Sequence, residues 1–262
     1  MTFTPPMARK EGRSFGRQTH WYVDANGLKI PGVTTIIGDG VPKPALMRWG
    51  INTVAEHAVD HWDELGLLTP SERLKQLKAS PYAQRDAAAN RGTEIHDIGS
   101  RLIHGTEVEV PDELAGHVEA YTAFLDAFDP QPVAVERPCV NYTIGYAGTF
   151  DLVADMGGTR WLLDLKTSKG VYGDTALQLA AYRSAEFLIA EDGSEQPMPA
   201  VERCAVVHIR ADGADLVPLV VDDSTFLDFR YAARVARWAT ETSKAAVLPA
   251  VTPGQLPLGD IA

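Results

Sequence analysis

Cysteine, positive charge and long apolar runs are all scarce in this 262-residue sequence. The two cysteines, Cys139 and Cys204, are far apart in the chain, and each lies in an apolar, strand-like run. We therefore expect buried thiols in a reducing compartment rather than a disulfide. No apolar run approaches the length of a membrane span, so no membrane is expected among the partners. The first residues, MTFTPPMARKEG, lack the apolar segment of a signal peptide, and we expect a cytoplasmic protein.

The balance of charge is acidic. Lysine and arginine number 24 against 35 aspartates and glutamates, which gives a net charge of −11. This argues against an open basic surface that binds nucleic acid by charge alone. A nuclease is still compatible with it, because cations neutralise an acidic metal site and one groove can be basic on an acidic body. Hydrophobic residues make up 45% of the chain, which is enough for a full core.

The most informative stretch is residues 148–182. Two apolar runs, 149–156 and 160–167, flank the dipeptide Gly157-Gly158. Paired glycines readily adopt the positive φ that a tight turn requires, so this stretch predicts a β-hairpin. A helix follows from Asp174 to about residue 190, with Asp174 or Thr175 as its N-cap.

Three charged residues lie on the hairpin. Adjacent antiparallel strands bring Asp151 and Asp164 side by side at one end of a sheet. Lys166 is two residues beyond Asp164, so both side chains point to the same face. Hard divalent cations prefer carboxylate oxygens, and a lysine beside such a cation can hold or deprotonate an attacking water. The alternative is a solvated surface hairpin, which does not explain why Gln178 and Tyr182 then share one face of the next helix.

These residues resemble the motifs of the PD-(D/E)XK nuclease superfamily, in its RecB-like branch. That branch includes phage recombination exonucleases and the nuclease of CRISPR spacer acquisition. Its motifs G-x-x-D, D/E-x-K and Q-x-x-x-Y read here as Gly148-Thr149-Phe150-Asp151, Asp164-Leu165-Lys166 and Gln178-Leu179-Ala180-Ala181-Tyr182. The match covers the central and C-terminal half. The N-terminal third matches only loosely, through the β-branched run 33–37.

The resemblance implies an α/β fold of the restriction-endonuclease-like form, in which helices flank a mixed central sheet. We expect residues 1–80 to form a hairpin and helices packed on the core as an N-terminal elaboration. Residues 81–248 would form the nuclease core, and residues 249–262 a loose tail. Residues 1–18 are polar and are expected to be a mobile tail.

A long helix is predicted from Pro81 to about His104. One face of it carries Ala89, Gly92, His96, Gly99 and Ile103. The two glycines on that face allow the helix to approach a sheet closely. A lone histidine there is most simply a core residue, but the RecB-like branch places a metal-ligating histidine on this helix. The resemblance therefore implies His96 as a metal ligand.

The resemblance implies a complete site for Mg²⁺ or Mn²⁺. Asp151, Asp164, the backbone carbonyl of Leu165 and His96 would bind the cation, with Lys166 beside the attacking water. Gln178 and Tyr182 would support the site or contact DNA, and Thr167 and Lys169 are candidate phosphate contacts. Glu136, on a strand predicted at 133–140, is a weaker candidate whose alternative is a solvated strand position. Some relatives carry an iron–sulfur cluster on four cysteines, which two cysteines cannot build within one chain.

The implied activity is a metal-dependent DNA exonuclease that hydrolyses phosphodiesters from DNA ends, in phage or bacterial recombination or repair. A phage origin would place it in the cytoplasm of the bacterial host. Two alternatives stay open: a structure-specific endonuclease, which would cut circular DNA, and a catalytically idle DNA-binding subunit of a recombination complex. The expected partner is linear DNA with ends. A single-strand annealing protein and further copies of this chain are additional candidates.

Five further elements are predicted from hydrophobic spacing and turn signals. A helix at 42–62 would place Trp49 in the core, with base stacking as the alternative reading. A separate charged helix follows with Ser71 as N-cap, and an apolar helix spans 112–128. A hairpin is predicted over 203–221, and a last helix over 224–244. One face of that helix carries Arg230, Arg234 and Arg237.

Overall fold

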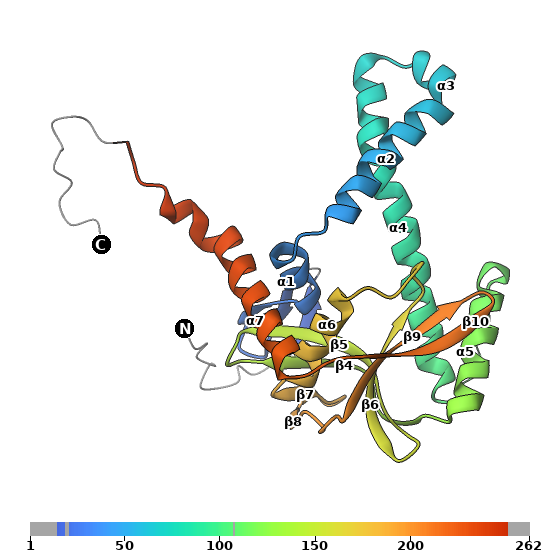
Figure 1. The fold of residues 1–262 in the computed structure, drawn as a ribbon, viewed down its shortest axis with the longest axis vertical. Helices are drawn as coiled ribbons and strands as arrows, with labels where there is room; N and C mark the ends of the chain where they lie inside the picture. Colours follow the sequence, from blue (N-terminus) through green and yellow to red (C-terminus); the bar gives the residue numbers. More distant parts are fainter. Residues whose placement is uncertain (1–14, 19–20, 107, 251–262) are drawn as a thin grey trace.

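The computed structural model describes residues 15–18, 21–106 and 108–250. It has an α/β fold in which helices flank a seven-stranded mixed sheet (Figure 1). The strand order is β10-β9-β6-β5-β4-β7-β8, and β6 and β9 form the parallel pair among antiparallel neighbours. The strands are β4 (Gln131–Asn141), β5 (Tyr146–Met156), β6 (Thr159–Lys166), β7 (Phe187–Ile189), β8 (Glu195–Pro197), β9 (Arg203–Arg210) and β10 (Gly213–Leu219). The predicted α/β class with a mixed sheet is confirmed.

The central hairpin forms as predicted. β5 and β6 pair antiparallel from Leu152 opposite Leu163 to Met156 opposite Thr159. The turn between them uses φ values of 56° at Gly157 and 77° at Gly158, which side chains other than glycine rarely adopt. The second predicted hairpin is also present, as β9 and β10.

Two helical layers cover the sheet. On one face, α1 (Val33–Gly40), α6 (Asp174–Arg183) and α7 (Asp223–Arg237) pack on a buried cluster that includes Phe150, Leu162 and Phe229. On the other face, α4 (Pro70–Leu102), η1 (Asp112–Leu114) and α5 (Ala115–Phe128) pack on Leu152, Leu163 and Val207. A small sheet of β1 (Gly16–Gln18), β2 (Trp21–Val23) and β3 (Lys29–Pro31) lies beside β5, linked by a bridge from Gly32 to Ala147. After α7 come η2 (Trp238–Thr242) and η3 (Ser243–Ala246).

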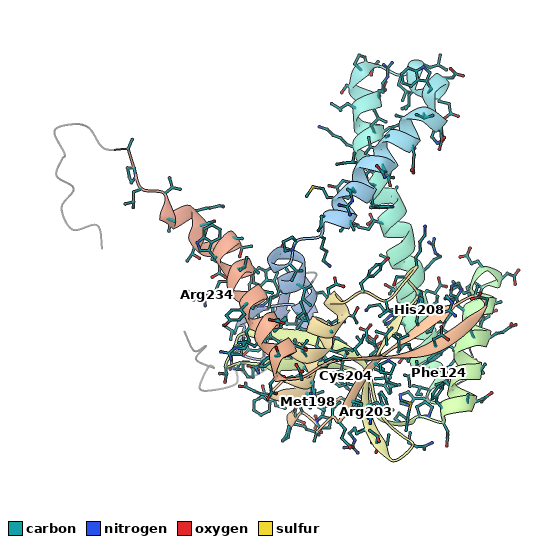
Figure 2. The ribbon with its side chains drawn as sticks, in the orientation of Figure 1. Phe124, Met198, Arg203, Cys204, His208 and Arg234 are labelled. Carbon is teal, nitrogen blue, oxygen red and sulfur yellow. The ribbon has the colours of Figure 1, made fainter. Side chains whose placement is uncertain are left out.

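An arm of helices projects away from the sheet (Figures 1 and 2). We use "the arm" for α2 (Pro44–Asp60), α3 (Trp62–Gly66) and the N-terminal half of α4. Trp49 belongs to the arm and is 37% exposed, so its prediction as a core anchor is wrong. The helix itself forms, but Thr53 is its buried residue, and Leu46 on the predicted apolar face is 53% exposed. Phe128, at the end of the apolar helix predicted at 112–128, is 42% exposed.

The expected helix break at Pro81 is wrong. α4 runs without interruption across it, and across the boundary that we expected between residues 80 and 81. A proline has no amide hydrogen to donate to the carbonyl four residues earlier. Here the hydroxyl of Ser80 donates to that carbonyl, of Leu77, at 3.0 Å. The N-cap is Thr69 rather than Ser71, and it forms a capping box with Glu72.

Two other predicted boundaries differ from the structure. The helix that begins at Asp174 ends at Arg183, not near residue 190, and its N-cap is Gly173. Residues 187–189 form β7 instead, because their backbone pairs with β4 on one side and β8 on the other. Tertiary pairing overrides helix propensity there. Residues 16–18 form a strand, while residues 1–14 of the expected N-terminal tail and residues 251–262 of the C-terminal tail lie outside the described part of the chain.

Both cysteines are buried free thiols, as predicted. Burial raises the pKa of Cys204 to about 11, and it raises the pKa of Cys139 further. Among the described residues, no helix is both long enough and apolar enough to cross a membrane.

Candidate metal centre

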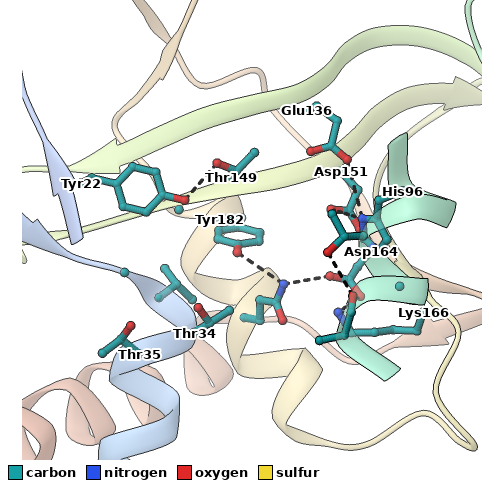
Figure 3. Close-up of a pocket in the computed structure, with 17 residues that line it drawn as sticks. Tyr22, Thr34, Thr35, His96, Glu136, Thr149, Asp151, Asp164, Lys166 and Tyr182 are labelled. Carbon is teal, nitrogen blue, oxygen red and sulfur yellow. Dashed lines mark hydrogen bonds and ion pairs between the residues drawn. The ribbon is translucent and has the colours of Figure 1, made fainter. Parts of the chain in front are cut away.

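A cleft of about 570 Å³ opens between α1, α4 and α6 and the strands β4, β5 and β6, with Glu136 and Asp151 at the middle of their strands. Figure 3 shows the side chains that line it. Seven residues singled out from the sequence are among them: His96, Glu136, Asp151, Asp164, Lys166, Gln178 and Tyr182. Of the other candidates, Leu165 contributes its backbone beside the cleft, Thr167 lines an adjoining cavity, and Lys169 is exposed.

His96, Glu136 and Asp151 form a group of side chains that could hold a metal ion, which we call the ligand group. One donor atom from each lies within 4.8 Å of the others. The Nδ1 atom of His96 is 3.4 Å from Asp151 Oδ1 and 3.7 Å from Glu136 Oε1. The Nε2 atom of His96 donates to the carbonyl oxygen of Leu165 at 2.8 Å. Two carboxylates therefore face one nitrogen of the imidazole. The Leu165 carbonyl, expected among the metal ligands, lies instead against the other ring nitrogen.

The position of Glu136 depends on an irregular backbone. Its φ is 48°, in the left-handed region that side chains other than glycine rarely occupy. The residue lies between two paired positions of β4 and β5, Val135 with Leu152 and Arg137 with Phe150. Phe150 packs on one face of the sheet and Leu152 on the other, although residues two apart in a regular strand share a face. The strand thus changes face at Asp151, opposite Glu136. No feature of the sequence indicated this irregularity.

Asp164 lies beside the ligand group but has other partners. It is 2% exposed, and its Oδ2 atom is 2.7 Å from the Nζ atom of Lys166. The side-chain amide of Gln178 donates to Asp164 Oδ1 at 2.8 Å and contacts the Tyr182 hydroxyl at 3.3 Å. Gln178 therefore holds Oδ1 by a hydrogen bond, whereas Oδ2 has the charge of Lys166 beside it but no hydrogen-bond partner among the described residues. The neighbouring Asp151 accepts a hydrogen bond from the backbone amide of Leu165 at 2.6 Å, which ties β5 to β6.

Burial and charge shift the pKa values in the cleft. Burial and the negative charge of Asp151 raise the pKa of Asp164 to about 6, although Lys166 acts in the opposite direction. Burial alone would lower the pKa of Lys166, but the charge and hydrogen bond of Asp164 outweigh it and raise that pKa. Lys166 is therefore a protonated cation at neutral pH.

His96 is also held in its protonated form. Burial acts to lower its pKa, but hydrogen bonds and charge from Asp151 and Glu136 outweigh burial and raise the pKa to about 10. The imidazolium offsets one of the two negative charges that face it. A divalent cation at this position would take over that role and displace the proton.

Glycines explain how closely the helices approach the site. A Cβ atom on Gly148 would lie 2.2 Å from a ring carbon of Tyr182, so glycine is required for α6 to pack on β5. A Cβ atom on Gly99 would lie 3.2 Å from both Leu165 and Tyr121, in agreement with the predicted close approach of this helix to the sheet.

Several cleft residues were not anticipated from the sequence. The hydroxyl of Tyr22 lies 3.0 Å from that of Thr149, and Thr34 and Thr35 from the first turn of α1 also line the cleft. They come from the N-terminal third, where the motif match is loosest. The arginines on one face of α7 do not line the cleft. They are Arg230, Arg234 and Arg237, and all three are exposed.

Comparison with known proteins adds little. No protein-family model matches the chain, and no curated protein matches it. Among solved structures, one titled "Crystal structure of SSO0001" is similar over 80% of this chain and 76% of its own, at 13% identity and a TM-score of 0.33. A likeness this distant carries no functional argument.

Proposed function

We propose that the protein is a divalent-metal-dependent DNA exonuclease of the RecB-like PD-(D/E)XK type, with a restriction-endonuclease-like core. One observation carries the proposal: the ligand group His96, Glu136 and Asp151 stands directly beside the buried ion pair of Asp164 and Lys166 in a single open cleft. A structural ion pair alone would need no such group, and a bare metal site would need no neighbouring lysine paired with a buried carboxylate.

The donor chemistry suits a hard cation. Asp151 and Glu136 offer carboxylate oxygens, and His96 offers its Nδ1 nitrogen once its proton leaves. The Leu165 carbonyl would orient the ring by accepting a hydrogen bond from Nε2. Mg²⁺ or Mn²⁺ held there would neutralise phosphate charge and lower the pKa of a bound water. Asp164 lies beside this set, and its Oδ2 atom, which accepts no hydrogen bond from the described residues, would be a further oxygen donor.

Lys166 acts as a cation in this proposal. Because its pKa is raised, it is not a base at neutral pH. It would hold the attacking water by donating a hydrogen bond, and it would offset the negative charge that develops on the phosphate. Gln178 and Tyr182 position the pair by fixing the other oxygen of Asp164.

The preference for DNA ends rests on charge. A chain with a net charge of −11 repels a long duplex laid across it, so binding would be confined to the cleft region. Such confinement favours entry from an end, consistent with a role in recombination or repair beside a single-strand annealing protein. Further copies of this chain could enclose the strand.

The deciding experiment is digestion of end-labelled linear DNA and covalently closed circular DNA with Mg²⁺, Mn²⁺ or EDTA. We expect cation-dependent loss of the linear DNA, steep inhibition by salt, and survival of the circles. Linearisation of closed circles at a comparable rate would identify an endonuclease instead. Binding of DNA without any cleavage under all cations would indicate an idle DNA-binding subunit. The purified protein should also be colourless, since an iron–sulfur cluster is not expected.

A further inference from the structure

Two more cavities continue from the cleft and form one path along the protein. A cavity of about 280 Å³ shares Thr34, Lys166 and Gln178 with the cleft. A groove of about 530 Å³ in turn shares Lys43, Tyr172 and Asp174 with that cavity. An extended molecule could therefore run from the candidate metal centre to the base of the arm.

The far end of this path is apolar and aromatic. Its walls include Pro42, Pro44, Leu46, Trp49 and Tyr172. Trp49 is 37% exposed and Tyr172 is 61% exposed, so neither ring is used to build the core. Large exposed aromatic groups gathered in one groove indicate a binding surface more often than a packing role.

The junction between the two cavities is charged. The Nζ atom of Lys43 lies 2.8 Å from Asp174 Oδ2, and both side chains are partly exposed, at 38% and 33%. An exposed pair of this kind contributes little stability, so an anionic group can compete with Asp174 for Lys43 at small cost. Lys166 provides the second cation at the other end of the path.

We propose that the groove of Leu46, Trp49 and Tyr172 binds unpaired nucleotides of the strand being cut. Their bases would stack on the two aromatic rings, and their phosphates would pass Lys43 toward Lys166. Only unpaired bases expose their faces to side chains in this way, because the bases of a duplex stack on each other. The substrate would thus be DNA with a single-stranded end. This inference rests on the proposed nuclease function and adds the form of DNA that the site accepts.

A nucleic acid fits the path better than a second protein copy. Each nucleotide unit carries both an apolar face and an anion, which matches the alternation of aromatic and basic groups. The groove is also continuous with the cleft through shared lining residues, and a folded partner would have to enter the cleft to follow that path.

The test measures binding of the full-length protein to two fluorescein-labelled strands of equal length. One strand is oligo(dT), and the other has the same backbone with abasic sites throughout. Anisotropy is read with Ca²⁺ in place of Mg²⁺, and a gel verifies that the strands stay intact. We expect Trp49→Ala and Tyr172→Ala each to weaken oligo(dT) binding about tenfold, with Trp49→Phe and Tyr172→Phe close to the wild type. The abasic strand should bind weakly and equally to all of them.

Matched controls are Trp62→Ala on α3 and Tyr231→Ala on α7, which remove exposed aromatic rings outside the groove. Both should bind oligo(dT) as the wild type does. Unchanged oligo(dT) binding by the Trp49 and Tyr172 alanine variants, or equal binding of the abasic strand, would overturn the proposal. A change in oligomeric mass in those variants without a change in DNA binding would identify the groove as a contact between copies, which also overturns it.

The two proposals fail in different ways. If the wild type cleaves no DNA with any cation, the nuclease function is lost, while stacking of oligo(dT) on Trp49 and Tyr172 would still be measurable. If the wild type cleaves DNA but the alanine variants cleave blunt and overhanging ends with unchanged KM, only the groove is wrong. A rise in KM for overhanging ends at constant kcat is the expected result.

Discussion

The two sides of the cleft carry similar side chains, but their charges are arranged in opposite ways. In the ligand group, two carboxylates face one imidazole, so a negative charge is left over even when His96 is protonated. In the ion pair, Lys166 balances Asp164, and Gln178 holds the remaining oxygen. A bound cation would neutralise the negative charge left in the ligand group, whereas the charges of Asp164 and Lys166 already balance.

Under the proposed function, this difference would separate metal binding from catalysis. Uncompensated carboxylates repel each other, and a divalent cation relieves that repulsion. A compensated pair gains nothing from a cation, but it keeps a lysine charged and fixed in a place that a flexible surface lysine would not hold. Substitutions in the ligand group should therefore change metal affinity. Substitutions in the ion pair of Asp164 and Lys166 should change the rate of DNA cleavage at saturating metal.

The largest effect is expected from Asp151→Asn. The change removes a ligand charge from the centre of the group, and we expect cleavage to fall by at least about 10³-fold. The asparagine oxygen can still accept the hydrogen bond from Leu165, so the variant should remain folded, which circular dichroism checks. Calorimetric titration with Mn²⁺ measures the lost affinity, and end-labelled DNA measures the lost activity.

Asp155→Asn is the matched control for that variant. Asp155 lies on the same strand, where it pairs with Arg160 near the surface. Its loss should leave both Mn²⁺ affinity and cleavage near the wild type. Normal Mn²⁺ binding by Asp151→Asn would rule out the ligand group as the metal centre.

The next effect is expected from Lys166→Met, on the compensated side. Cleavage should fall by about 10²-fold or more at saturating metal, while Mn²⁺ affinity stays within a few fold of the wild type. The substitution leaves the buried Asp164 without its cation, so the double variant with Asp164→Asn separates loss of folding from loss of chemistry. The exposed Lys244→Met serves as the control. A large loss of Mn²⁺ affinity in Lys166→Met would contradict the division between the two sides.

A smaller effect is expected from Glu136→Gln. We expect Mn²⁺ affinity to fall about tenfold to a hundredfold, with most of the rate restored when more metal is added. Glu119→Gln, on the exposed face of α5, is the matched control. If the variant loses activity that no metal concentration restores, Glu136 belongs with Lys166 in the chemistry rather than with the ligand group.

Much of this site could be predicted because its signals are local. The paired glycines place a turn, and the two-residue period of a strand places Asp164 and Lys166 on one face. The glycine at 99 likewise indicated the close approach of α4 to the sheet. These inferences need only neighbouring residues, so a single sequence suffices for them.

The remaining features depend on contacts between distant segments. The positive φ of Glu136 arises where β4 meets β5, and nothing near residue 136 in the sequence specifies it. α4 continues through Pro81 because one hydroxyl replaces the missing donor, which residue propensities do not capture. The helix at 174 stops early because the following residues complete a sheet. The sequence makes Glu136 only a weak site candidate because its position depends on the contact between β4 and β5.

The last prediction concerns pH and the proton on His96. Its pKa in the metal-free fold is about 10, against an ordinary value of 6.5, so the ring is protonated throughout the neutral range. A ring nitrogen that binds metal must lose that proton, so each metal ion bound should release about one proton. Mn²⁺ affinity should then rise about tenfold per pH unit between pH 7 and pH 9, where Asp164, with a pKa of about 6, is already ionised.

Calorimetry in buffers of different ionisation enthalpy counts the released protons directly. His96→Gln should bind Mn²⁺ more weakly and without proton release, whereas His104→Gln, at an exposed position after α4, should behave as the wild type. In the metal-free protein, the contact of the imidazolium with its two carboxylates stabilises the fold fully below pH 6.5, and this stabilisation is lost as the pH rises through about 10. Metal affinity that is independent of pH, with no protons released, would place the cation away from His96. In that case the carboxylates of Asp151 and Glu136 would bind the metal alone, and His96 would remain a protonated imidazolium.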